Sequence, residues 1–137
     1  MASFNKFESF IGQVGLGGHN LNTDTLKIML TNTAPNATDD TKSDITEITA
    51  QNGYTAGGHA VPSSAYSESG GTGSLSGNDV VITASGGSFG PFRYAVLYND
   101  TSATDLLIGW WDYGSSKTPA DGESFTVDFG ASILTLA

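Results

Sequence analysis

The stretch SFGPFRYAVLYNDTSATDLLIGWWDYG, residues 88–114, carries most of the large apolar and aromatic side chains of this chain. It predicts two strands, 92–99 and 105–113, joined by the loop 100–104, whose Asp, Thr and Ser residues favour turns. In both strands the apolar residues occupy successive positions rather than alternate ones. A strand that is apolar on both faces is covered on both faces. The hairpin is therefore expected either at the centre of a sheet or pressed against another molecule.

Trp110 and Trp111 are neighbours in the second predicted strand. Side chains of adjacent strand residues point to opposite faces, so one ring can enter the core while the other reaches the far face. Both rings can serve core packing. Alternatively, one anchors an interface, a role in which Trp is enriched, or stacks on a sugar.

The composition favours an all-β domain. A chain of 137 residues with 38% hydrophobic residues suits a single core. Its 18 glycines, its many Ser and Thr residues and its low content of charged residues (14%) are typical of short strands joined by many turns. Seven or eight such strands predict a single-domain antiparallel β-sandwich, jelly-roll-like, with a short N-terminal helix or arm.

The formal net charge is −9, which argues against nucleic acid and anionic membranes as partners. The absence of cysteine excludes disulfides, thiolate metal sites and thiol nucleophiles. The sequence has no apolar run of about 18 residues, and its first residues lack the pattern of a signal peptide. We therefore expect synthesis in the cytoplasm of the producing cell.

The N-terminal segment 1–21 is expected to form a short helix or arm, apart from a sandwich over 22–137. Phe4, Phe7 and Ile11 are spaced as on one face of a helix, with Phe10 beside them, and Ser3 is a suitable N-cap. These residues predict a helix over 3–11 that contacts a neighbouring subunit.

Two further strands contribute to the predicted sheet. In 25–31, Leu26, Ile28 and Leu30 alternate with residues of an exposed outer face. In 60–67, Pro62 places the strand at an edge, where partners attach. The candidate interface residues are therefore Phe4, Phe7, Phe10, Ile11, Pro62 and Trp111.

Few residues are arranged for catalysis. His19 and His59 lie in glycine-rich loops and in no motif of an activated nucleophile, so both are interpreted as loop histidines. Asp112 and Asp128 could form the acid pair of a glycosidase. The simpler interpretation places Asp112 at a strand end and Asp128 on the outer face of a strand.

Asp39, Asp40 and Asp44 could in principle bind calcium. Their spacing differs from that of an EF-hand, and Lys42 lies among them, so solvated loop charge is the better interpretation. We expect no catalytic residues, no cofactor and no metal, and a protein that is not an enzyme.

Several segments resemble a family of small tailed-bacteriophage virion proteins, the capsid cement or decoration proteins. They are LKIMLTNTAP (26–35), DITEI (44–48), NGYTAGG (52–58), GPFRYAVLYNDT (90–101), LIGWWDYGSS (107–116) and DGESFTVDF (121–129). The resemblance implies a jelly-roll-like sandwich without enzymatic activity. It also implies dimers or trimers bound on the outer capsid surface, over joints between subunits of the major capsid protein. Residues 1–21 match least well.

Two alternative functions remain. The chain could be a carbohydrate- or receptor-binding module of a head or tail fibre, with Trp110, Trp111 or Tyr98 as a stacking platform. A small hydrolase would need a cleft that unites His19 or His59 with a carboxylate and a hydroxyl.

Overall fold

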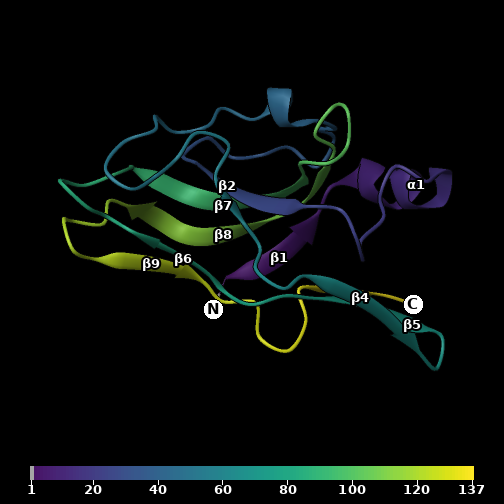
Figure 1. Ribbon diagram of the computed structural model, residues 1–137. Coiled ribbons are helices and arrows are strands. Elements are labelled where there is room, and N and C mark those ends of the chain that lie inside the picture. Colours follow the sequence, from purple (N-terminus) through teal and green to yellow (C-terminus); the bar gives the residue numbers. More distant parts are fainter. Residues whose placement is uncertain (1) are drawn as a thin grey trace.

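The computed structural model describes residues 2–137. In this range the chain is predominantly β, with one α-helix and one short 3-10 helix (Figure 1), and the predicted all-β antiparallel sandwich is confirmed. The helices are α1 (Glu8–Leu16) and η1 (Lys42–Asp44). The strands are β1 (Ser3–Lys6), β2 (Leu26–Thr31), β3 (His59–Ala60), β4 (Ala65–Ser69), β5 (Thr72–Ser76), β6 (Val80–Thr83), β7 (Phe92–Asn99), β8 (Leu107–Lys117), β9 (Ser124–Val127) and β10 (Leu134–Leu136).

The sandwich has two strand layers and a cover of loops (Figure 1). One layer is a five-stranded sheet in the order β1-β8-β7-β2-β3. The opposite layer holds two smaller sheets, β6-β9 and β10-β5-β4. The long loops between β2 and β3 lie over the outer face of the five-stranded sheet. This sheet is therefore covered on both faces.

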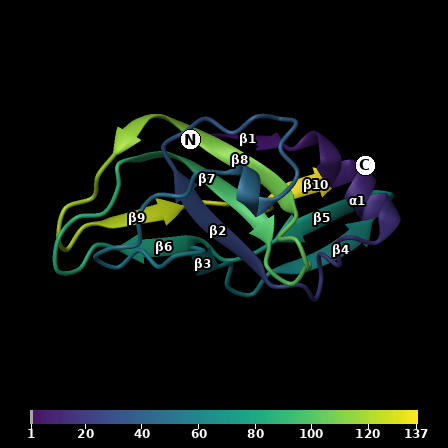
Figure 2. The same ribbon diagram turned by 90° about the horizontal axis from the view of Figure 1, so that it is seen from above.

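The two smaller sheets lie end to end and behave as one interrupted ribbon (Figure 2). β5 leads into β6 and β9 leads into β10, and the pairs β5–β10 and β6–β9 are both antiparallel. Between the pairs Leu75–Leu134 and Val80–Val127, one strand advances by 5 residues and the other by 7. The two additional residues form the loop that separates the sheets.

The hairpin β7–β8 is internal in the five-stranded sheet. The predicted strand 92–99 coincides with β7, and the predicted strand 105–113 corresponds to β8, which begins at Leu107 and continues to Lys117. β7 also pairs with β2, and β8 also pairs with β1. Of the two positions expected for the hairpin, the centre of a sheet is the one observed.

Successive apolar residues in the hairpin serve two cores. Leu97 and Trp111 face the main core between the layers, whereas Val96 and Tyr98 join a second cluster beneath the loops. Met29 of β2 also belongs to this second cluster and is fully buried. The prediction of an exposed outer face for 25–31 was therefore wrong, because the loops after β2 fold back over it.

The two tryptophans lie on opposite faces of β8, as the alternation of strand side chains predicts. Trp111 packs in the main core against Phe129, with ring centroids 5.5 Å apart. Trp110 lies on the outer face, with its ring centroid 4.6 Å from that of Phe7, and is partly buried.

The N-terminal segment is a strand followed by a helix, so the predicted helix over 3–11 was wrong in its bounds. β1 pairs with β8, and the Phe7 N–H extends this pairing by donating to the Ile108 carbonyl at 3.1 Å. Gly109 of β8 lacks a Cβ, and the ring of Phe4 occupies the space that a Cβ would need. Sheet pairing and this close contact outweigh the helical spacing of the aromatic residues.

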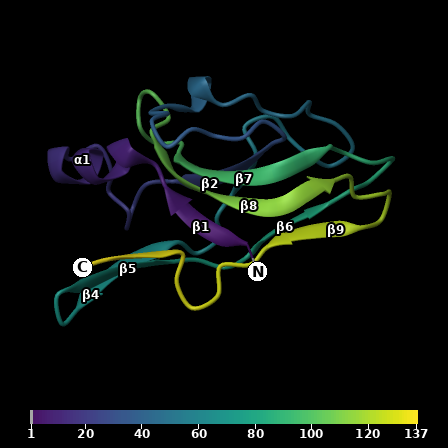
Figure 3. The ribbon, with the colours of Figure 1, turned by 180° about the vertical axis from the view of Figure 1, so that it is seen from behind.

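Pro62 lies in no strand. β3 ends at Ala60, β4 begins at Ala65, and Pro62 lies in the connection that carries the chain from one layer to the other. The predicted strand over 60–67 is therefore divided and Pro62 lies outside it, but both flanking strands, β3 and β4, are edge strands of their sheets, as predicted. Figure 3 shows that α1 projects at the end of the sandwich opposite the β6-β9 sheet, above the β4–β5 hairpin.

Candidate interaction surface at helix α1

The predicted interface residues have different environments. Phe7, Phe10 and Trp111 are buried within the chain, so a partner cannot reach them in this structure. Ile11 is 52% exposed, and Pro62 is also exposed. Exposed apolar surface is therefore found at α1 rather than at the aromatic residues beside it.

Helix α1 presents one face to the core and another to solvent. Phe10 is fully buried, and Val14 packs partly against the main core. On the outer face, Ile11 is 52% exposed and Leu16 is 82% exposed, the largest value among the exposed large apolar residues. Sequence reasoning missed Leu16 because the predicted helix ended at Ile11.

Gly17 was the signal that could have placed the end of this helix. It adopts the left-handed conformation, with φ of 83°. Its N–H is directed to the carbonyls of Gln13 and Val14 in the last turn, an arrangement for which glycine is the usual residue. A C-terminal glycine cap after an apolar residue predicts a helix that ends at Leu16.

Gly12 and Gly15 lie on the outer face of α1, and the chain itself does not require glycine at either position. A Cβ added at either residue would meet no atom within 4 Å, and neither backbone is left-handed. Glycine inside a helix costs about 0.5–1 kcal/mol relative to alanine. Because these two glycines have no side chains, the outer face of α1 is shallow between the exposed side chains of Ile11 and Leu16.

The segment around this face carries no Asp, Glu, Lys or Arg from residue 9 to residue 23. For a chain of net charge −9, an uncharged and partly apolar surface offers less electrostatic resistance to protein contacts than a charged one. We name the outer face formed by Ile11, Gly12, Gly15 and Leu16 the α1 face.

A cleft of about 660 Å³ is lined by residues of β8 and β9. Both carboxylates of the possible glycosidase pair, Asp112 and Asp128, are among its lining residues. Asp112 accepts two hydrogen bonds from Arg93, at 2.8 and 3.1 Å. This contact and the Gly114 N–H lower the pKa of Asp112. Asp128 accepts a hydrogen bond from the Gly130 N–H. A carboxyl group with a lowered pKa is the opposite of the general acid that glycoside hydrolysis requires.

A second cleft, of about 430 Å³, opens between the C-terminal end of α1 and the β10-β5-β4 sheet. Its apolar lining includes Val14, Leu21, Tyr66 and Leu136, and His19 lies in its wall. It adjoins the α1 face at Gly17.

His19 is held by a buried polar network. The Asn99 side chain donates to Asp24 Oδ2 at 2.7 Å and lies 3.0 Å from His19 Nδ1. Because the Asn99 Oδ1 already accepts the N–H groups of Thr101 and Ser102, its amide nitrogen faces His19 and donates to Nδ1. His19 is therefore neutral, with its proton on Nε2, and burial lowers its pKa.

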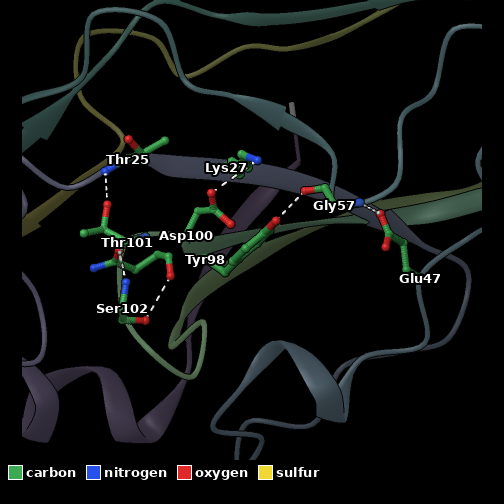
Figure 4. Close-up of polar contacts among 9 residues, drawn as sticks. Thr25, Lys27, Glu47, Gly57, Tyr98, Asp100, Thr101 and Ser102 are labelled. Atoms are coloured by element: carbon green, nitrogen blue, oxygen red, sulfur yellow. Dashed lines mark hydrogen bonds and ion pairs between the residues drawn. The ribbon is translucent and has the colours of Figure 1, made fainter.

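The same Asn99 fixes the loop after β7, because its Oδ1 accepts the N–H groups of Thr101 and Ser102. Figure 4 shows the neighbouring contacts of this loop. The Thr25 N–H donates to Thr101 Oγ1 at 2.8 Å, and Ser102 Oγ donates to the Asn99 carbonyl. Lys27 Nζ lies 3.3 Å from Asp100. These contacts tie the hairpin loop to the start of β2, and they are structural.

Glu47 joins two parts of the loop cover to each other, and Tyr98 of β7 binds the cover to the sheet (Figure 4). Its Oε2 accepts the Tyr54 hydroxyl at 2.5 Å and the Gly57 N–H at 2.8 Å. The Tyr98 hydroxyl donates to the Gly57 carbonyl. Burial raises the pKa of both Tyr54 and Tyr98, and the carboxylate of Glu47 reinforces the shift at Tyr54. His59 was predicted to lie in a loop but is part of strand β3, where it pairs with Ile28. It is half-buried near Tyr54, and burial lowers its pKa.

The acidic loop residues act as backbone acceptors. Asp39 accepts the Asn36 N–H, and Asp44 accepts the N–H groups of Asp40 and Thr41. Within residues 2–137, no group of three His, Cys, Asp or Glu side chains is placed to hold a metal ion. In the same part of the chain, no helix is long and apolar enough to cross a membrane.

No protein-family profile, curated protein or solved structure matches this chain. Its function is therefore argued from the fold, from the surfaces above and from the resemblance noted in the sequence.

Proposed function

We propose that this chain is a structural protein of a tailed-bacteriophage virion. It acts as a decoration protein that binds the outer surface of the major capsid protein shell and stabilises the head. The segments that resemble decoration proteins support this proposal by their position, since they run from β2 to β9 and include both strands of the central hairpin. The resemblance thus includes four strands of the framework, β2, β7, β8 and β9, rather than one surface loop.

The α1 face adds a second argument, because a decoration protein functions through contacts with the shell and with its own copies. An uncharged face with two exposed large apolar side chains is a suitable contact surface. Extended contacts across subunit boundaries stabilise a shell by mass action, because they must break before the subunits separate.

The rings available for sugar stacking argue against a glycan-binding module. Tyr98 is 1% exposed and Trp111 is 5% exposed, while Trp110 packs on Phe7. Tyr98 and Trp111 therefore present no free face for stacking on a sugar, and Trp110 is partly buried against Phe7.

The proposal is tested with phage heads that lack this chain. Purified protein is added to the heads, and binding is followed by co-sedimentation, while rupture is followed by release of DNA on heating or on chelation of divalent cations. We expect saturable binding and rupture at a higher temperature. The absence of binding, or binding with no change in rupture, would contradict the proposal, and binding to cell-surface glycans would replace it with receptor recognition.

A further inference from the structure

The α1 face has a symmetrical pattern of residue types. Residues 11–16 read Ile-Gly-Gln-Val-Gly-Leu. The midpoint of this segment lies between Gln13 and Val14. In each direction, the second residue from the midpoint is a glycine and the third is a large apolar residue. Sequence in this order looks alike from either end of the helix.

The same residues form a shallow groove. At about 100° per residue, Gly12 and Gly15 fall at the middle of the solvent side, with Ile11 on one flank and Leu16 on the other. The glycines leave room for close approach, and the two flanking side chains are the exposed ridges. The fold of the single chain uses neither the glycines nor the ridges.

We propose that the α1 face binds the α1 face of a second copy of this chain, with the two helices antiparallel and a two-fold axis between Gln13 and Val14. A two-fold interface requires one surface that is complementary to itself, and an antiparallel pair requires equivalent residues at equal distances from the axis. The arrangement Ile11-Gly12 and Gly15-Leu16 meets both conditions. The glycines of one helix then approach those of the other, and the apolar flanks cover them.

Charge favours the antiparallel over the parallel orientation. Two chains of net charge −9 repel each other, and the repulsion is weaker where they meet through an uncharged surface such as residues 9–23. Glu8 is the single charged residue of α1. An antiparallel pair places the two Glu8 carboxylates at opposite ends, whereas a parallel pair places them side by side.

The pairing is expected to be weak for free chains. A helix of 9 residues buries far less than the roughly 1,200–2,000 Å² of stable interfaces. Copies that are concentrated on a surface pair more readily through effective concentration. The proposal rests on the geometry of α1 and does not depend on the decoration function.

Replacing both glycines by alanine is expected to raise the stability of the monomer and to weaken its association. Gly12→Ala/Gly15→Ala stabilises the monomer, because alanine is the better helix former and each added methyl meets open space. The same methyl groups hold the two helices apart, so we expect association to weaken about tenfold or more. Urea unfolding measures the first effect, and sedimentation equilibrium from about 10 μM to about 1 mM measures the second.

The matched control is Val81→Gln, which removes another exposed large apolar residue, 54% exposed on β6, and leaves association unchanged. Leu16→Gln weakens association. If the wild-type chain stays monomeric over this range, or if the alanine variant associates as well as wild type, the proposal is wrong.

Single cysteines determine the orientation, because the chain has no cysteine of its own. In the antiparallel pair the two copies of position 12 lie about 4–5 Å apart along the helix axis, and those of position 8 lie about 16 Å apart. A disulfide needs Cα atoms about 4.4–6.8 Å apart. Gly12→Cys is therefore expected to form a disulfide-linked dimer on mild oxidation, and Glu8→Cys is not. Efficient cross-linking of Glu8→Cys would show a parallel pair, and no cross-linking of either variant would overturn the proposal.

Discussion

The central hairpin β7–β8 and the N-terminal segment β1–α1 are both rich in large apolar residues, but these residues have different environments in the two regions. Every strand of the hairpin has a neighbour on each side, and its two faces serve two cores. The N-terminal segment buries Phe7 and Phe10 but leaves Ile11 and Leu16 in solvent. Apolar content therefore does not distinguish a scaffold from a contact surface. The distinction depends on whether other segments of the chain pack over each apolar face.

The hairpin can be apolar on both faces because the chain supplies a second cover. The loops between β2 and β3 lie over the outer face. Glu47 joins their parts through Tyr54 and Gly57, and the Tyr98 hydroxyl of β7 binds the Gly57 carbonyl. No described segment of residues 2–137 gives the outer face of α1 a similar cover, since Leu16 stays 82% exposed.

The largest expected effect contrasts one side chain from each region. Trp111→Ala removes a buried ring between the layers, and we expect a loss of about 3–5 kcal/mol in the free energy of unfolding. Leu16→Ala is expected to change it by less than about 0.5 kcal/mol. Urea unfolding followed by fluorescence measures both. Comparable losses would mean that the α1 face is part of the folded core.

The next effect tests the cover of the hairpin. Glu47→Gln removes the charge that accepts the Tyr54 hydroxyl and the Gly57 N–H, with an expected cost of about 1–3 kcal/mol. Hydrogen exchange should become faster in the loops between β2 and β3 and stay unchanged in β4–β5. Glu68→Gln is the control, because this carboxylate accepts a hydrogen bond only at the exposed turn after β4. Equal effects of the two substitutions would contradict a special role for Glu47.

Much of the framework could be predicted from the sequence. The successive apolar positions located the central hairpin, and the adjacent tryptophans had to face opposite sides. The outer face of β2 could not be predicted, because Met29 is buried by loops whose own sequence is polar and shows no apolar pattern. Such burial depends on tertiary contacts that periodicity does not record.

The N-terminal segment illustrates a second limit. The spacing of Phe4, Phe7 and Ile11 fits a helix, but pairing with β8 makes the first part a strand. The α1 face was missed for the same reason, since with α1 placed too early, Gly12, Gly15 and Leu16 did not fall on one helical face. The sequence analysis predicted Ile11 as a contact residue together with Phe7 and Phe10. The sequence could not show that Ile11 is exposed whereas the two aromatic residues are buried in the core.

A smaller effect depends on pH. Burial lowers the pKa of His19 and of His59 in the folded chain below the unfolded value of 6.5. Below pH 6.5 the unfolded chain binds protons that the folded chain does not, so stability decreases as the pH falls from 7 towards 5. Thermal unfolding across this range measures the decrease, and His19→Gln should reduce the slope. A melting temperature that rises on acidification would contradict the buried network around Asn99.

The smallest effect concerns the exposed ion pair of Arg93 and Asp112. Both side chains are more than one third exposed, so solvent and salt screen the pair. Asp112→Asn should lower stability only slightly in dilute buffer and not at all in molar salt. A large loss of unfolding free energy that persists in molar salt would show that the ion pair stabilises the hairpin and is not merely a screened surface contact.

We propose that this chain is a decoration protein whose hairpin is a scaffold and whose contacts lie elsewhere on its surface. The most direct test is the number of copies of the chain per virion, measured by quantitative mass spectrometry of purified particles against the major capsid protein. We predict a number comparable to that of the capsid subunits or capsomers, in the order of hundreds. A handful of copies per particle would place the chain in a tail or fibre, and its absence from particles would reject the claim.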